Sequence, residues 1–326
     1  MKIIAAGHIC LDITPVFPDG KSYETPGDFL SPGKVYHMGP ADVHTGGSVA
    51  NTGLAMKILG ADVSLMGKVG ADDFGKVIGE ILARYGAGGL LVDEESSTSY
   101  SVVLAIPGID RIFLHNPGAN DSFCSADIPE EALEGADLFH FGYPPLMKRI
   151  YQEDGKELVQ IFSRMKERGI LTSLDMAAVD PDSPEGKVDW RAFLKNVLPH
   201  VDYFLPSFDE ISFMLGGEKD LRTICETLIG YGAGTVVIKC GTDGLCYMSG
   251  DGFGTQPCIE APFVASSTGA GDTSIAAFLV ATLQGRPLSE CVALAAAEGA
   301  CCCTAYNALD GLKTIPDLEE MISNAR

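Results

Sequence analysis

The chain has 326 residues, of which 46% are apolar, and a formal net charge of −21. This length allows one large hydrophobic core, and the negative charge disfavours nucleic acid and anionic membrane surfaces as partners. No apolar run reaches membrane-spanning length, the N-terminus lacks signal-peptide features, and the ten cysteines include no C-x-x-C pair. We therefore expect a cytoplasmic protein with reduced cysteines.

Predicted strands and helices alternate along most of the chain, which is typical of an α/β domain with a largely parallel sheet. The first predicted strand covers residues 2–6, and Asp12 follows in an alternating apolar pattern. Residues 15–45 then interrupt the rhythm with five prolines and several glycines. We expect this segment to lie outside the main sheet.

A predicted helix begins at the glycine pair Gly46-Gly47 and continues through small and apolar residues to Gly60. Asn51 lies one turn into it. An asparagine at this place either hydrogen-bonds a hydroxylated ligand or bonds locally to the backbone.

A second interruption covers residues 96–120. Two predicted strands, 100–106 and 112–115, are joined by Pro107-Gly108-Ile109-Asp110, which is a hairpin signal. Such a hairpin either covers an active site or is a plain surface feature. The α/β rhythm then resumes with strands predicted at 138–141, 170–174, 203–205 and 235–239.

Two common nucleotide-binding motifs are excluded. No G-x-G-x-x-G follows the first strand, which argues against a dinucleotide-binding domain. The P-loop-like spacing at residues 70–77 has two aspartates in its loop and Val77 where a magnesium-binding Ser or Thr is needed.

The segment Ser266-Ser267-Thr268-Gly269-Ala270-Gly271-Asp272 precedes a predicted helix that ends near Gly285. A helix N-terminus presents unpaired N–H groups and partial positive charge, and glycines let an anion approach. A carboxylate at this place either complements the helix dipole or accepts a proton from an attacking hydroxyl group.

Together these segments resemble the PfkB family of ribokinase-like carbohydrate kinases. Residues 46–60 and 268–272 resemble its two signatures, and residues 67–75 resemble the stretch after the first. The resemblance covers nearly the whole chain. It implies a single domain over residues 1–326, a three-layer α/β/α sandwich with a mostly parallel sheet, and a small β-sheet lid from insertions at about 15–45 and 96–120.

The resemblance also implies ATP-dependent transfer of the γ-phosphoryl group to a hydroxymethyl group of a small ribose- or fructose-like sugar. It makes Asp272 the general base and the backbone of Gly269, Ala270 and Gly271 the anion hole. The implied sugar-binding residues are Asp12, Gly46, Gly47, Asn51 and Asn120. The implied nucleotide-binding residues are Lys239, Gly241, Gly244 and Thr268.

Two positions depart from the family pattern. The N-x-x-E motif is Ser207-Phe208-Asp209-Glu210, which keeps Glu210 as the implied magnesium residue. Ser266 replaces an aspartate that is linked to a monovalent cation in many members, so the use of K⁺ stays open. Family lids often pair between subunits, which implies a homodimer.

Two alternatives remain at this stage. A nucleoside kinase of the same fold would need an aromatic or apolar slot for the base, for which Phe17, Phe113 and Tyr143 are candidates. A sugar sensor without catalysis would not need Asp272. A sugar-phosphate acceptor is disfavoured, because the motif-bearing segments contain few basic residues.

Overall fold

The computed structural model describes residues 1–17, 22–109 and 111–324. Its main sheet has eight strands: β1 (Lys2–Gly7), β4 (Asp62–Met66), β9 (Leu138–Gly142), β10 (Leu171–Leu174), β11 (Tyr203–Phe204), β12 (Thr235–Lys239), β13 (Leu245–Ser249) and β14 (Gly252–Gln256). They lie in the order β14-β13-β12-β11-β10-β9-β1-β4. The strands from β12 to β4 run parallel, and β13 and β14 extend one edge antiparallel. The predicted mostly parallel sheet is confirmed.

The central strands are buried on both faces, which explains their continuous apolar sequences. In β1, Ile3 and Ala5 pack into one hydrophobic core, whereas Ile4 and Ala6 pack into the other. Successive side chains of a strand point to opposite faces, so one apolar strand supplies both cores.

Helices cover both faces of the sheet. On the face of Ile3 lie α2 (Ser48–Ile58), α3 (Asp73–Arg84), α8 (Ala270–Leu283), α9 (Leu288–Cys302) and α10 (Ile315–Asn324). On the face of Ile4 lie α4 (Lys148–Glu167, interrupted at residues 152–155), α5 (Trp190–Val197), α6 (Phe208–Met214) and α7 (Leu221–Gly230). The predicted three layers are therefore present.

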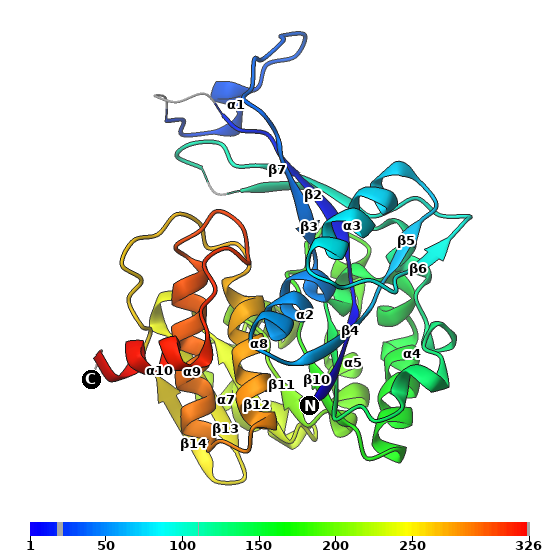
Figure 1. Ribbon diagram of the computed structural model, residues 1–326, viewed down its shortest axis with the longest axis vertical. Helices are drawn as coiled ribbons and strands as arrows, with labels where there is room; N and C mark the ends of the chain where they lie inside the picture. The colour runs from blue at the N-terminus through cyan, green and yellow to red at the C-terminus, as the bar shows by residue number, and fades with distance from the viewer. Residues whose placement is uncertain (18–21, 110, 325–326) are drawn as a thin grey trace.

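A smaller sheet stands beyond one end of the main sheet (Figure 1). Its strands are β2 (Cys10–Thr14), β3 (Asp42–Gly46), β7 (Tyr100–Leu104) and β8 (Ile112–Asn116), in the order β3-β2-β7-β8. The predicted hairpin is the antiparallel pair β7–β8. The short helix α1 (Pro26–Phe29) lies in the chain between β2 and β3, and β5 (Lys68–Gly70) pairs with β6 (Leu91–Asp93). Residues 18–21 of the first predicted insertion and Asp110 of the predicted turn lie outside the described residues.

The register of the small sheet separates polar from apolar side chains. One cross-strand row contains His44, Asp12, Ser101 and His115, and the neighbouring row contains Val43, Ile13, Val102 and Leu114. Adjacent rows point to opposite faces, so this sheet has one polar and one apolar face where these rows cross it.

Three strands of the main sheet and the start of the small sheet differ from the sequence-based expectation. Strands β4, β13 and β14 of the main sheet were not predicted, and β2 begins at Cys10, ahead of the predicted insertion at residue 15. In the described part of the chain, no helix is both long and apolar enough to cross a membrane.

Candidate active site

A cavity of about 1040 Å³ lies at the carboxyl ends of the parallel strands. Its lining includes His8 directly after β1, Tyr143 directly after β9, Asp175 directly after β10, and Lys239, the last residue of β12. Residues of the small sheet line it as well, among them Asp12 and Phe113. Ligands of open α/β sheets bind at these strand ends, so the fold itself marks this cavity as the candidate site.

The N-terminus of α8 opens into the cavity. Thr268, Gly269, Ala270, Gly271 and Asp272 all line the cavity, as the sequence predicts. Gly269 has φ +80°, and a Cβ atom there would lie 2.2 Å from the Cβ of Ala308. Only glycine fits this turn. In the described part of the chain no side chain caps the helix start. The Ala270 N–H donates to the Ser267 carbonyl at 3.3 Å, so an anion at this N-terminus would have to share or displace that bond.

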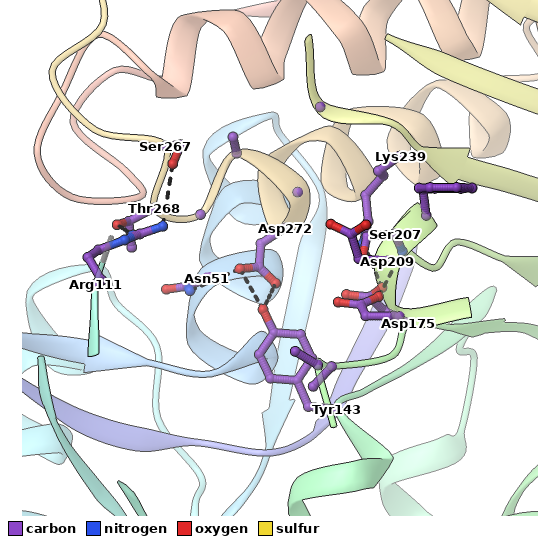
Figure 2. A pocket seen from close by; sticks show the side chains of 18 of the residues that line it. Asn51, Arg111, Tyr143, Asp175, Ser207, Asp209, Lys239, Ser267, Thr268 and Asp272 are labelled. Carbon is purple, nitrogen blue, oxygen red and sulfur yellow. Dashed lines mark hydrogen bonds and ion pairs between the residues drawn. The ribbon is translucent and has the colours of Figure 1, made fainter. Parts of the chain in front are cut away.

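Asp272 is buried and held by donors from two other segments. Asn51 Nδ2 donates to Oδ2 at 3.0 Å, and Thr52 Oγ1 donates to Oδ1 at 3.1 Å. The Tyr143 hydroxyl lies 2.8 Å from Oδ1 and 2.9 Å from Oδ2 (Figure 2). A carboxylate accepts hydrogen bonds at both oxygens, so these donors fix the orientation of the Asp272 side chain.

Tyr143 is a site residue that sequence reasoning did not assign to Asp272. Burial, followed by the charge of Asp272, raises the pKa of its hydroxyl well above the usual value, so the hydroxyl stays protonated and donates. Its backbone is left-handed, with φ 65° and ψ 46°. Such a conformation is uncommon for a non-glycine residue and is frequent at functional sites. The available signal was its place directly after a buried parallel strand.

Asp12 projects from β2 into the small-sheet side of the cavity. It accepts a hydrogen bond from the Cys10 thiol at 3.3 Å, and burial raises the pKa of its carboxyl. Gly46 does not line the cavity, but a Cβ atom there would lie 2.2 Å from Asp12 Oδ2. Gly46 therefore makes room for the carboxylate. Gly47 and Asn51 line the cavity beside it.

Asn120, expected from the sequence to be among the sugar-binding residues, lies outside the cavity lining. Its side chain is fully buried. Its amide donates to the carbonyl of Ile9 at 2.9 Å and accepts from the Ile9 N–H at 3.2 Å. Asn120 thus hydrogen-bonds the backbone of Ile9 as a neighbouring strand would, and these bonds stabilise the chain at residue 9.

Lys239 and Asp175 form a buried ion pair at the other end of the cavity. Lys239 Nζ lies 2.7 Å from Asp175 Oδ1 (Figure 2). Desolvation raises the pKa of Asp175, and Glu210 and Asp272 add to the rise, whereas Lys239 opposes it and favours the carboxylate. A Cβ atom at Gly271 would lie 3.6 Å from Lys239 Nζ, so the ammonium group is close to the start of α8.

Glu210 lines this end of the cavity and also caps α6. Its carboxylate accepts the backbone N–H of Ser207 at 2.7 Å. Among the described residues, no group of three or more His, Cys, Asp and Glu side chains is placed to hold a metal ion.

The glycine turn after β12 is only partly exposed to the cavity. Gly241 lines it, whereas Gly244 does not. Gly244 has φ +88°, and a Cβ atom there would lie 2.2 Å from the carbonyl oxygen of Gln256. Its position explains the turn between β12 and β13.

Arg111 connects the β7–β8 hairpin to the helix start. Its guanidinium donates to the Thr268 hydroxyl and, at 3.4 Å, to Ser267 Oγ (Figure 2). Ser266 stabilises the same loop, because its hydroxyl donates to Thr268 Oγ1 at 2.9 Å and accepts the Thr268 N–H at 3.1 Å. A neutral hydroxyl therefore performs the local bonding at residue 266.

Residues 9–315 match the family described as pfkB family carbohydrate kinase. This chain belongs to that family. Fructokinase-2 of Oryza sativa subsp. japonica is 26% identical, covering 99% of this chain and 94% of the relative. The cytidine kinase of Thermococcus kodakarensis is 26% identical, covering 90% and 93%. The structure of Arabidopsis thaliana ribokinase complexed with ribose and ATP has a TM-score of 0.78, 22% identity and 98% coverage of both chains. This pfkB member is accordingly a phosphotransferase of the carbohydrate kinase class.

Proposed function

We propose that this protein transfers the γ-phosphoryl group of ATP to a hydroxymethyl group of a small ribose- or fructose-like sugar. The observation that carries the proposal is the position of Asp272. Its buried carboxylate lies at the start of α8 and is hydrogen-bonded to Asn51. We call the end of the cavity lined by the small sheet the acceptor end, and Lys239 lies beyond Gly271 at the opposite end. A base between an acceptor pocket and an anion site suits phosphoryl transfer.

In the proposed reaction, Asp272 accepts the proton of the acceptor hydroxyl while that oxygen bonds to the γ-phosphorus. The bond from the γ-phosphorus to the bridging oxygen breaks, and ADP leaves with that oxygen. The N–H groups of Gly269, Ala270 and Gly271 are proposed to stabilise the charge on the transferring group. Asp12, Gly47 and Asn51 are proposed to hold the sugar, with Gly46 shaping the space for Asp12.

The nucleotide is proposed to lie along Lys239, Gly241 and Thr268, with Gly244 fixing the turn. Lys239 is already paired with Asp175, so phosphate oxygens would compete with that carboxylate for the ammonium group. Glu210 is proposed to hold Mg²⁺ through water, and the ion would offset phosphate charge. We assign no K⁺ requirement, because Ser266 offers a neutral oxygen that is already bonded to Thr268.

A nucleoside acceptor is the second candidate. Phe113 lines the cavity and is 54% exposed, so it is available to stack on a base. Tyr143 is committed to Asp272, and Phe17 packs against Phe29 at 5.0 Å between ring centroids. Of the three aromatic candidates, Phe113 has the position that a base slot requires.

The small sheet is proposed to act as a lid on a single domain of residues 1–326, with insertions at about 15–45 and 96–120. Its exposed apolar row, which ends in Val43 and Leu114, supports a homodimer through the lid. A cytoplasmic location is proposed because all ten cysteines are free thiols.

Substitution of the proposed base tests the function. We expect Asp272→Asn to lower turnover by about 10²- to 10⁴-fold, because the amide cannot accept the hydroxyl proton. ATP consumption would be measured with a panel of sugars and nucleosides. Asp251→Asn, on the exposed turn between β13 and β14, is the matched control.

Each outcome has a distinct meaning. Near-native turnover of Asp272→Asn would refute the mechanism. Turnover with nucleosides alone would establish the second candidate. Sugar binding without ATP consumption for every acceptor would indicate a sensor that does not catalyse the reaction.

A further inference from the structure

Two histidines meet at the acceptor end of the cavity. His8 follows β1 in the main sheet and His115 lies on β8 in the small sheet, with ring centroids 5.2 Å apart. Both line the cavity. Within the described residues, His8 Nδ1 and His115 Nε2 are buried and have no hydrogen-bond partner. Buried polar atoms normally have a hydrogen-bond partner, so we expect a bound ligand to hydrogen-bond these two nitrogens.

The bonding of the other His8 nitrogen fixes what Nδ1 can do. His8 Nε2 faces Ser99 Oγ at 3.5 Å, and the Ser99 hydroxyl donates to the carbonyl of Asn116 at 2.8 Å. Since the only hydroxyl proton of Ser99 is used there, its oxygen must accept from His8 Nε2–H. In a neutral imidazole, Nδ1 is then a lone pair that accepts hydrogen bonds.

The tautomer of His115 is inferred in the same way, from its neighbour in the polar row of the small sheet. His115 Nδ1 lies 3.0 Å from Ser101 Oγ. Asp12 is the cross-strand neighbour of Ser101 in the same polar row, and a carboxylate only accepts hydrogen bonds. A Ser101 proton directed at Asp12 would leave the Ser101 oxygen to accept from His115. In that arrangement Ser101 accepts from His115 Nδ1–H, and His115 Nε2 is an acceptor.

Both rings are neutral at neutral pH. Desolvation is the largest cause that lowers the pKa of His8, and it also lowers the pKa of His115. Glycine at residue 47 keeps space open beside His8 Nδ1, because a Cβ atom there would lie 2.7 Å from this nitrogen. The acceptor end thus presents a carboxylate, Asp12, and two neutral lone pairs.

We propose that His8 Nδ1 and His115 Nε2 determine acceptor specificity by accepting hydrogen bonds from two hydroxyl groups of an unphosphorylated polyhydroxy substrate. This inference rests on the proposed function. A ligand rich in hydroxyl donors satisfies all three acceptor groups, whereas a phosphate ester would place its charge against Asp12 and two lone pairs. A site built to bond a hydroxyl group discriminates strongly against an analogue that lacks it.

Two substitutions remove one lone pair each and keep the internal bond. The Nε2 of glutamine in His8→Gln replaces the donor to Ser99, and the Nδ2 of asparagine in His115→Asn replaces the donor to Ser101. We expect each variant to raise the KM and the dissociation constant of the preferred sugar by about 10-fold. The kcat should stay within about 3-fold, because neither ring contacts Asp272. His37→Gln, on an exposed loop, is the matched control.

A series of monodeoxy sugars gives the decisive readout. Removing the hydroxyl that a histidine binds should weaken sugar binding to the wild-type protein. The same removal should have little effect on binding to the variant that lacks this histidine. Unchanged deoxy ranking in both variants, or tighter binding of sugar phosphates than of the neutral sugars, would overturn the inference. Calorimetric measurement of sugar binding without ATP separates the two proposals. If the protein consumes no ATP but its sugar binding still depends on the histidines, only the kinase mechanism is refuted.

Discussion

At the scale of single residues, Tyr143 shows how the end of a strand can position the proposed base, Asp272. Its left-handed backbone turns the side chain toward α8, where one hydroxyl proton is shared by both oxygens of Asp272. Strained backbone is kept where the surroundings over-determine it. We assign Tyr143 the positioning of Asp272, because its hydroxyl touches the carboxylate rather than an acceptor.

Tyr143→Phe tests that assignment. It removes only the hydroxyl, so we expect the kcat to fall by about 10-fold while the KM for ATP stays within about 2-fold. Steady-state kinetics with the preferred sugar is the measurement, and Tyr306→Phe, with a side chain 79% exposed, is the control. Wild-type kcat in Tyr143→Phe would contradict a positioning role.

The candidate residues were predictable only where a local motif carries them. The stretch from Thr268 to Asp272 is contiguous, and the structure places all of it on the cavity. Asp175 and Tyr143 have no local motif, since their roles arise from the parallel strands that align them with residues far along the chain. Asn120 has the right type in the right region, but its bonds to Ile9 bury it.

At the scale of elements, prediction succeeded where burial produces a clear pattern. Strand β12 has the predicted bounds, Thr235–Lys239, because both of its faces are buried. The edge strand β14 is mostly exposed or half-buried and holds two glycines, so its sequence has little strand signal. The antiparallel edge therefore became visible only in the structure.

Helix α9 contains a buried carboxyl group outside the active site. Glu298 is fully buried, and desolvation raises the pKa of its carboxyl to about 8, which the Lys313 backbone N–H only partly opposes. The folded protein thus holds a proton that the unfolded chain releases near the ordinary pKa of 4.5. The stability contributed by the protonated form is complete below that value and is lost as the pH rises toward 8.

Glu298→Gln removes this dependence. We expect the variant to be more stable than the wild type by about 3 kcal/mol at pH 8, with the difference shrinking toward pH 5. Chemical denaturation across this pH range is the measurement, and Glu320→Gln on the exposed surface of α10 is the control. A difference that is constant with pH would refute the buried-proton account.

At the scale of the whole molecule, the small sheet explains both access to the site and the proposed dimer. Its polar row faces the cavity, where Asp12, Ser101 and His115 are lining residues. The adjacent row exposes 43% of Val43 and 54% of Leu114. Exposed apolar side chains on a sheet face favour association with a second copy, although the net charge of −21 opposes it at low salt.

Leu114→Glu tests the dimer. A carboxylate in that row would have to be buried in the interface, so we expect the sedimentation coefficient to change from that of a dimer to that of a monomer. Val92→Glu places the same charge at a 61% exposed position on β6 and should leave the dimer intact. A monomeric wild-type protein would refute the proposed pairing.

The connections between the two sheets have a mechanical consequence. Only His8 and Ile9 separate β1 from β2, and only Gly47 separates β3 from α2. Any swing of the small sheet against the main sheet must pivot at these links as well as at the ends of the hairpin. Because His8 and Gly47 also line the cavity, the links at which such a swing would pivot and the proposed sugar pocket share residues. A sugar that bonds to His8 would therefore contact one of these links directly. Binding of the sugar would then be coupled to the angle between the two sheets.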